Sequence, residues 1–203
     1  MITIVIQAGG QSRRMGRDKA LLPFLGQALI QRVFARLAPM ADELIITTNN
    51  PKDYAFLNLP LFGDMRPGRG ALGGLYTALA CASHPLVAVV ACDMPFVSPK
   101  LLTYQARLLE EEACDVAIPF TGNGYEPLHC VYRRESCLSA VEWALDHDAW
   151  RMVSWLARVK TRTLTADECG MFDPQRLAFC NINTPEECTA AEELARRMEH
   201  SSS

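Results

Sequence analysis

The sequence predicts an α/β fold with a mostly parallel central sheet, and two observations lead to that prediction. Three short segments are apolar at nearly every position, namely Ile2–Ile6, Leu44–Thr48 and Leu86–Ala91. Such runs are typical of strands buried on both faces of a parallel sheet. Apolar residues recur at helical spacing from Leu29 to Leu37 and from Leu72 to Leu79. Strands that alternate with helices in this way indicate an α/β fold.

Two further elements continue this alternation. A weaker apolar run, Leu59–Phe62, stops at Gly63 and predicts another strand. Ser98 is a good N-cap and Pro99 suits the first helical position, so a helix is expected from there towards Glu112.

The second half of the chain is less regular. Asp115–Pro119 and Leu128–Arg133 resemble strands, with a turn at residues 121–124 between them. Helices are expected near Ser136–Asp146 and Trp150–Val159.

A last helix begins with a strong signal. Thr184 caps it, Pro185 takes the first helical position, and Glu187 completes a capping box. No repeat or linker interrupts the sequence. We therefore expect a single domain over residues 1–199, followed by a frayed tail at residues 200–203.

Composition excludes several classes of protein. The chain has 203 residues, 49% of them hydrophobic, which is enough for a substantial core. Its net charge of -3 disfavours general binding to nucleic acid. No signal-peptide pattern or membrane-length apolar run is evident, which predicts a cytoplasmic protein without membrane association. The eight cysteines include no C-x-x-C pair, so we expect thiols in the core rather than zinc ligands or disulfides.

Candidate functional residues gather in four loops. In open α/β sheets, ligands bind outside the carboxyl ends of the strands. The loops expected there are Ala8–Lys19, Asn49–Asn50, Asp64–Gly74 and Cys92–Pro95. They contain glycines, cations, an amide pair and two acids, a combination that indicates a site for phosphate and metal.

The first loop offers the clearest phosphate chemistry. Gly9 and Gly10 let backbone N–H groups approach a phosphate, although such a pair alone is more often an ordinary tight turn. Arg14 and Lys19 can neutralise a triphosphate, and the alternative is a solvated basic face. The patterns of P-loop NTPases and dinucleotide-binding enzymes are both missing from the sequence.

The other loops supply oxygen and amide groups. Asp93 follows a buried strand and can hold Mg²⁺ through its carboxylate, unless it only starts the turn before Pro95. Asn49 and Asp64 suit a base or ribose, and both are equally common turn residues. Four glycines within residues 68–74 indicate close approach of a ligand to the backbone, or tight packing of a helix on the sheet.

Taken together, these motifs resemble those of a known family. Residues 8–19 read AGGQSRRMGRDK and resemble the nucleotidyltransferase signature A-G-G-x-S-x-R-M-G-x-D-K. The resemblance continues at Gly70–Gly74, Cys92–Pro95 and Asn181–Glu187, in the same order and at similar intervals. It covers almost the whole chain and is closest to the molybdenum cofactor guanylyltransferases.

The resemblance implies a Rossmann-like nucleotidyltransferase fold and a specific reaction. Members transfer GMP from GTP to the terminal phosphate of molybdopterin, release pyrophosphate and require Mg²⁺. The expected partners are GTP, molybdopterin and proteins of molybdoenzyme maturation. Because the acceptor phosphate is already anionic, catalysis should depend on alignment and charge neutralisation by Lys19, Arg14 and Asp93, with no nucleophilic serine or cysteine.

The family's site residues can be placed on this sequence. The nucleotide-binding positions implied are Ala8, Gly9, Gly10, Lys19, Asn49, Asp64 and Asp93. Asp93 is also the implied metal ligand, and Asn181 and Asn183 would lie at the molybdopterin side. The chain departs from the family at Gln7, where leucine is usual, and this leaves the detail of base selection open.

Two alternatives remain at this point. One is a cytidylyltransferase or sugar-phosphate nucleotidyltransferase of the same fold. The other is a non-catalytic module that binds a nucleotide or delivers the cofactor, and intact Lys19 and Asp93 argue against it.

Overall fold

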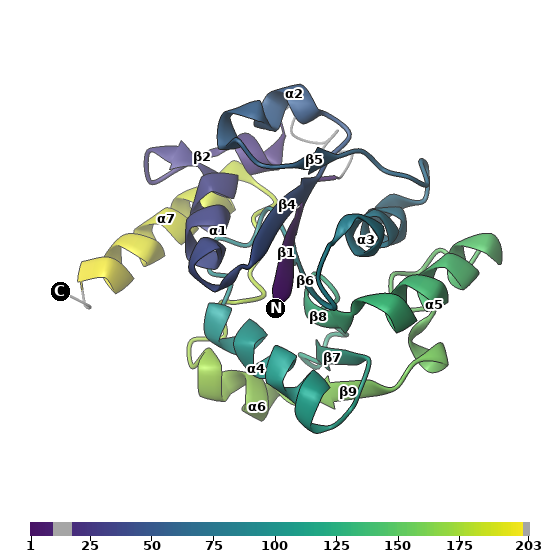
Figure 1. The fold of residues 1–203 in the computed structure, drawn as a ribbon. Helices are drawn as coiled ribbons and strands as arrows, with labels where there is room; N and C mark the ends of the chain where they lie inside the picture. The colour runs from purple at the N-terminus through teal and green to yellow at the C-terminus, as the bar shows by residue number, and fades with distance from the viewer. Residues whose placement is uncertain (10–17, 201–203) are drawn as a thin grey trace.

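A computed structural model describes residues 1–9 and 18–200 and shows a central sheet between layers of helices (Figure 1). The sheet has seven strands in the order β5-β4-β1-β6-β8-β7-β9. These strands are β1 Ile2–Gln7, β4 Glu43–Thr47, β5 Leu61–Phe62, β6 Leu86–Ala91, β7 Val116–Pro119, β8 His129–Arg133 and β9 Thr161–Leu164. Strand β8 runs antiparallel to β6 and β7, and the other neighbouring pairs are parallel. The predicted fold class is confirmed.

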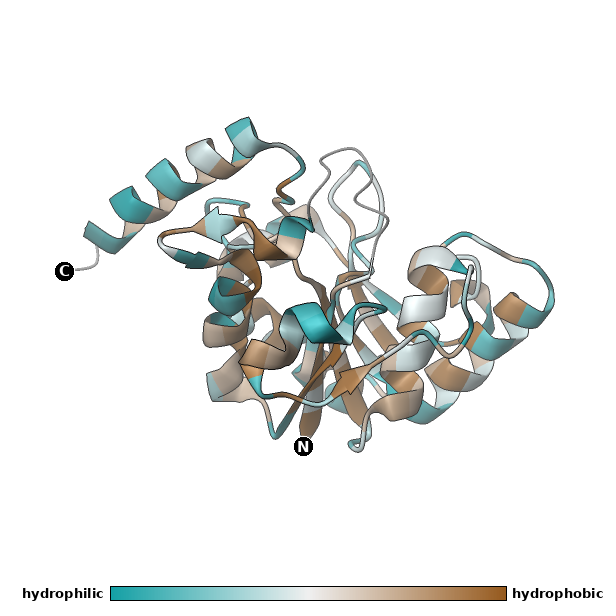
Figure 2. Cartoon of the chain, turned by 90° about the horizontal axis from the view of Figure 1, so that it is seen from above, coloured by the Kyte–Doolittle hydropathy of each residue, from teal (hydrophilic) through white to brown (hydrophobic). Residues whose placement is uncertain are grey.

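Helices cover both faces of the sheet. They are α1 Leu29–Leu37, α2 Pro51–Tyr54, α3 Gly70–Cys81, α4 Pro99–Glu111, α5 Arg134–Asp146, α6 Ala166–Phe172 and α7 Pro185–His200. Helices α1 and α4 pack on one face and α3 and α5 on the other, which gives two hydrophobic clusters (Figure 1). Figure 2 shows the central strands mostly in hydrophobic brown, between helices in which brown, white and teal residues alternate.

Strand β1 shows why its sequence is apolar at nearly every position. Ile2, Ile4 and Ile6 join the cluster under α1 and α4, whereas Val5 joins the cluster under α3 and α5. Its neighbours β4 and β6 both pair with it in parallel. Both faces of the strand are therefore inside the core, as expected for a central parallel strand.

A third cluster holds the C-terminal helix in place. A short hairpin, β2 Pro23–Phe24 and β3 Gln27–Ala28, packs against α7, and Phe24, Ile182 and Ala195 are buried together there. The Leu25 N–H donates to Glu192 Oε1 at 2.5 Å. The last helix thus packs beside the β2–β3 hairpin (Figure 1).

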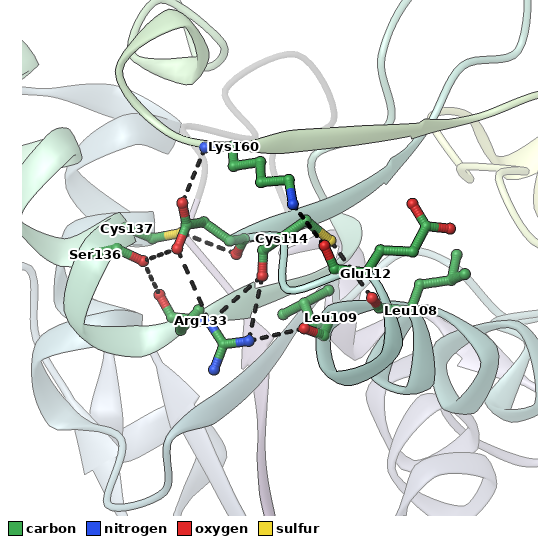
Figure 3. A network of polar contacts seen from close by, with 9 residues as sticks. Leu108, Leu109, Glu112, Cys114, Arg133, Ser136, Cys137 and Lys160 are labelled. Carbon is green, nitrogen blue, oxygen red and sulfur yellow. Dashed lines mark hydrogen bonds and ion pairs between the residues drawn. The ribbon is translucent and has the colours of Figure 1, made fainter.

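A polar network lies at the end of the sheet where β7 begins and the antiparallel β8 ends (Figure 3). The Arg133 guanidinium donates to the carbonyl of Leu109 at 2.8 Å, and Asp115 accepts from Ser136 Oγ at 2.6 Å. The Lys160 N–H also donates to Asp115, at 2.9 Å. Because these groups satisfy one another at the end of the sheet opposite the carboxyl ends of the parallel strands, we assign this network a structural role.

The prediction of a helix over Trp150–Val159 is wrong. The segment forms turns that end in a 3-10 helix, Leu156–Arg158. The Leu156 N–H donates to the carbonyl of Val153, and the buried Trp155 indole donates to the carbonyl of Met152. The indole therefore takes a carbonyl that an α-helix would use for its own backbone.

All eight cysteines lie within the described residues, and each is a free thiol. Five are buried, as the sequence predicts for core residues. Across residues 1–9 and 18–200, no helix combines the length and apolar composition needed to cross a membrane.

Candidate active site

The site lies where the carboxyl ends of β4, β1 and β6 meet. The Ala8 N–H donates to the carbonyl of Thr47 at 2.8 Å, and the Cys92 N–H donates to that of Gln7 at 3.2 Å. These two bonds fix the points where the flanking loops leave the sheet. Ala8 is buried and Gly9 is exposed. The predicted residues Gly10 and Arg14 lie outside the described part of the chain.

Lys19 is positioned by its neighbour Asp18. Asp18 caps a short 3-10 helix, Lys19–Leu21, by accepting from the Ala20 N–H at 3.0 Å. Its other carboxylate oxygen accepts from the Tyr54 hydroxyl at 2.5 Å. Burial and this hydrogen bond raise the pKa of Tyr54, so the hydroxyl remains a donor. Sequence reasoning assigned no role to Asp18 or Tyr54, although an aspartate directly before a helical turn is a recognisable capping signal.

Three predicted residues from distant parts of the sequence converge here. The Lys19 ammonium donates to Asn183 Oδ1 at 2.6 Å. The Ile182 N–H donates to the Asp93 carbonyl at 3.0 Å, which ties the same segment to the loop after β6. The expected phosphate-binding lysine, metal-binding aspartate and pterin-side asparagine therefore share one centre. Asn181 is exposed beside them.

The Asp93 side chain has the character of a ligand for a hard cation. It is half-buried, and burial raises its pKa while the charge of Lys19 acts in the opposite direction. Among the described residues, no group of three acidic, histidine or cysteine side chains could hold a metal. A lone carboxylate fits Mg²⁺ bound jointly with substrate phosphates, which is the usual arrangement for that ion.

Asn49 and Asp64 form a reciprocal pair. The Asn49 amide donates to Asp64 Oδ2 at 2.7 Å, and the Asp64 N–H donates to Asn49 Oδ1 at 2.9 Å. This pair joins the loop after β4 to the loop after β5. Asn49 is exposed and Asp64 is half-buried, and both lie at the carboxyl ends of the strands. A base or ribose could compete there for their polar groups.

The glycines of α3 have a packing explanation. A Cβ on Gly73 would lie 2.8 Å from the Arg66 carbonyl oxygen, and one on Gly74 would lie 2.7 Å from Gln7 Cδ. The buried Gln7 amide also donates to the Ala71 carbonyl at 3.2 Å. Of the two alternatives that the sequence left open, the structure shows close packing of the helix at these two positions.

Two arginines missed by sequence reasoning fix the loop before α3. Arg69 pairs with Asp148 at 2.6 Å, and its guanidinium lies 4.5 Å from the centre of the Trp150 ring. Arg66 forms ion pairs with Glu142 and Asp146 on α5. No local motif marks these residues, because their partners lie more than seventy positions away in the sequence.

The start of α7 differs from the predicted capping box in one respect. Thr184 Oγ1 accepts from the Glu187 N–H at 3.1 Å, so the cap itself is confirmed. The Glu187 carboxylate accepts from the Asn183 N–H at 2.6 Å, one residue before the predicted partner. The box therefore fixes the backbone of the residue that contacts Lys19.

Comparison with known proteins adds a family match. Residues 4–161 match the model of the MobA-like NTP transferase domain. A probable molybdenum cofactor guanylyltransferase from Natranaerobius thermophilus is 33% identical, with 98% of each chain covered. A molybdenum cofactor guanylyltransferase from Desulfosudis oleivorans is also 33% identical, with 94% of each chain covered.

Solved structures agree with this match. The molybdopterin-guanine dinucleotide biosynthesis protein A of Archaeoglobus fulgidus has a TM-score of 0.82 and 26% identity, over 96% of this chain and 99% of that one. A 2-C-methyl-D-erythritol 4-phosphate cytidylyltransferase from Thermus thermophilus has a TM-score of 0.64 at 18% identity, with 95% and 98% covered. The second similarity extends to the fold alone.

Proposed function

The chain belongs to the MobA-like NTP transferase family, among its molybdenum cofactor guanylyltransferases, and we propose from that membership that it transfers GMP from GTP to molybdopterin. The acceptor is the terminal phosphate of molybdopterin, and the products are the guanine dinucleotide cofactor and pyrophosphate. The two guanylyltransferase relatives named above favour this reaction over cytidylyl or sugar-phosphate transfer.

The observation that best supports the proposal is the contact between Lys19 and Asn183. A phosphate-binding cation from the N-terminal loop meets the segment expected at the pterin side, with Asp93 tied to that segment by Ile182. A reaction that joins two phosphates needs both substrates at one centre, and this is the geometry that it requires.

The reaction exchanges one phosphorus–oxygen bond for another. An oxygen of the molybdopterin phosphate attacks the α-phosphorus of GTP, and the bond from that phosphorus to the bridging oxygen of the β-phosphate breaks. Pyrophosphate leaves with the bonding electrons. Lys19 offsets charge on the phosphates, while the hydrogen bonds of Asp18 to Ala20 and Tyr54 fix the backbone turn that carries the lysine. No side chain needs to form a covalent intermediate.

Mg²⁺ is the metal that this chemistry implies. Asp93 would hold it together with the phosphates, and the ion would supply charge neutralisation. The half-buried carboxylate supports this role, since an adjacent cation would offset the cost of its desolvation. The Asn49–Asp64 pair and the buried Ala8 would define the nucleotide side, together with the exposed Gly9.

A turnover assay with purified protein tests the proposal. Molybdopterin, Mg²⁺ and GTP are supplied and pyrophosphate release is followed, with CTP in a parallel reaction. We expect turnover with GTP and much slower turnover with CTP. Lys19→Ala should reduce the rate strongly, whereas Lys52→Ala, which changes an exposed lysine on α2, should not. Equal rates with both nucleotides, or a preference for CTP, would contradict guanylyl transfer.

A further inference from the structure

A cavity lies along the chain segment that leads to the centre formed by Lys19 and Asp93. Its volume is about 300 Å³, close to the lower end of the range for small-molecule sites. It lies between the loop after β7, helix α6 and the segment that leads to α7. The lining residues are Thr121, Asn123, Glu126, Ala166, Cys169, Asp173, Arg176, Phe179 and Cys180.

One short segment links the cavity to the phosphate centre. Phe179 and Cys180 line the cavity, Ile182 bonds to Asp93, and Asn183 contacts Lys19. Three residues of extended chain span at most about 10 Å, so the lining residue Cys180 lies within about that distance of Asn183. A molecule with a ring in the cavity could therefore place an attached phosphate beside Lys19.

Sheet order separates this cavity from the expected nucleotide side. Asn49 and Asp64 follow β4 and β5, on one side of β1 and β6. Thr121 and Glu126 belong to the loop between β7 and β8, on the other side of those central strands. The two substrates would thus occupy opposite sides of the Asp93 loop, with their phosphates meeting between them.

Glu126 is a carboxylate in this cavity whose orientation is set by a neighbouring side chain. Its Oε1 accepts from the Thr121 hydroxyl at 2.9 Å, which orients the carboxylate. Within the described part of the chain, no donor reaches its other oxygen. Asp173 also lines the cavity, but its donor is a backbone group: its Oδ2 accepts from the Ala178 N–H at 2.7 Å, so this carboxylate stabilises the local turn. The Phe179 ring is held edge-on against the buried His129, with ring centres 5.2 Å apart.

We propose that this cavity binds the pterin ring of molybdopterin, and that Glu126 recognises it. This inference rests on the proposed function, since it names the subsite for the acceptor. A pterin presents a ring N–H beside an exocyclic amino group, two donors in a row. A carboxylate oriented by Thr121 can accept from both, and such charge-assisted pairs are stronger than neutral ones.

Binding of small ring compounds tests the assignment without turnover. The probes are 6-hydroxymethylpterin and 6-hydroxymethyllumazine, in which a carbonyl replaces the 2-amino group. Protein affinity is measured from the fluorescence of each probe. We expect the unmodified protein to bind the pterin at least about tenfold more tightly, because one charge-assisted hydrogen bond is lost with the lumazine.

Glu126→Gln provides the matched test of the residue. It keeps the size of the side chain and an oxygen for Thr121, but it removes the second acceptor. We expect it to abolish the preference for the pterin, and to raise KM for molybdopterin by about 10- to 100-fold with KM for GTP unchanged. Glu135→Gln, on the exposed surface of α5, should behave like the unmodified protein.

The outcomes distinguish this inference from the proposed function. Equal affinity for the two probes, or a Glu126→Gln protein that keeps its preference, overturns the pterin assignment even if GMP transfer occurs. A Glu126-dependent preference for the pterin supports the assignment even if GMP transfer fails, in which case the proposed function is the part that is wrong.

Discussion

The Gln7 side chain fills the space where a side chain at position 74 would begin. Gln7 Cδ lies 2.7 Å from the position of a Cβ on Gly74, and the Gln7 amide donates to the Ala71 carbonyl one turn earlier in α3. Gln7 is thereby packed beneath the first turns of that helix. The absence of a side chain at position 74 therefore leaves room for the Gln7 side chain.

A double-mutant cycle tests this pair. Alanine at position 74 should gain up to about 1 kcal/mol from helix propensity but lose about 1–3 kcal/mol from overpacking against Gln7. We expect Gly74→Ala alone to destabilise the protein by about 1–2 kcal/mol, and to be neutral or stabilising in a Gln7→Ala background. Denaturant unfolding of the four proteins measures the coupling.

Gly170→Ala is the matched control for the cycle. Gly170 lies in α6, where a Cβ would meet open space, so this substitution should stabilise the protein slightly. If the effects of Gly74→Ala and Gln7→Ala simply add, the two residues do not compete for space.

Asp93→Asn tests the metal-binding role. The substitution keeps the size of the side chain but removes the charge that Mg²⁺ prefers, and the residue lies beyond the end of β6, so the fold should survive. Loss of about 3–4 kcal/mol of transition-state stabilisation predicts a rate about 10²–10³ times lower. Steady-state GMP transfer over a Mg²⁺ titration measures this effect. Asp167→Asn, at an almost fully exposed side chain, is the control. A well-folded Asp93→Asn protein with a near-normal rate would leave Asp93 as a turn residue only.

Asn183→Ala tests the link between the two substrate sides. The variant loses the hydrogen bond from Lys19, and bonds to charged groups contribute about 1.5–3 kcal/mol. We expect KM for molybdopterin to rise about tenfold or more, with a much smaller change in GTP affinity. Asn181→Ala should have the weaker effect. Joint loss of thermal stability and GTP affinity, with no separate effect on molybdopterin, would show that Asn183 only shapes the start of α7.

His129 should make the fold sensitive to acid. Its Nε2 accepts from the Ser98 N–H at 3.1 Å, and its buried Nδ1 has no partner within the described residues. Burial lowers its pKa to about 4, so the unfolded chain binds a proton more readily between pH 6.5 and 4. The contribution of the neutral, buried His129 to the stability of the fold is therefore complete above about pH 6.5 and is lost as the pH falls towards 4.

Unfolding at two pH values isolates this effect. Between pH 7.5 and 5, the unmodified protein should lose about 2 kcal/mol more stability than His129→Gln, which retains an acceptor for Ser98 but does not titrate. His200→Gln, at the exposed end of α7, is the control. Equal pH dependence in all three proteins would contradict the role of His129.

The first half of the fold follows from its sequence because its periodic signals are strong. Strands β1 and β6 are buried on both faces and apolar throughout, and α1 has a clear apolar face. Strand β9 was missed because its sequence TRTL is half-exposed and mostly polar, typical of an edge strand. Helix α6 was also missed, although Thr165 and Glu168 form a capping box that the sequence displays.

The sequence predicts individual residues of the site, but not the contacts between them. Loops at the carboxyl ends of strands, with their glycines and charges, locate Lys19 and Asp93. The contact between Lys19 and Asn183 spans 164 positions, and no local pattern reveals it. The same holds for the cavity around Glu126, because three separate segments of the chain build it.

Following the separate phosphates of GTP tests the central claim most directly. GTP labelled at the α-phosphate, or at the γ-phosphate, is incubated with the protein, Mg²⁺ and molybdopterin. Guanylyl transfer predicts that the α label enters the pterin product, and that the γ label appears in an equal amount of pyrophosphate. Recovery of the γ label as inorganic phosphate with GDP, or no α label in the pterin product from a folded protein, would contradict it.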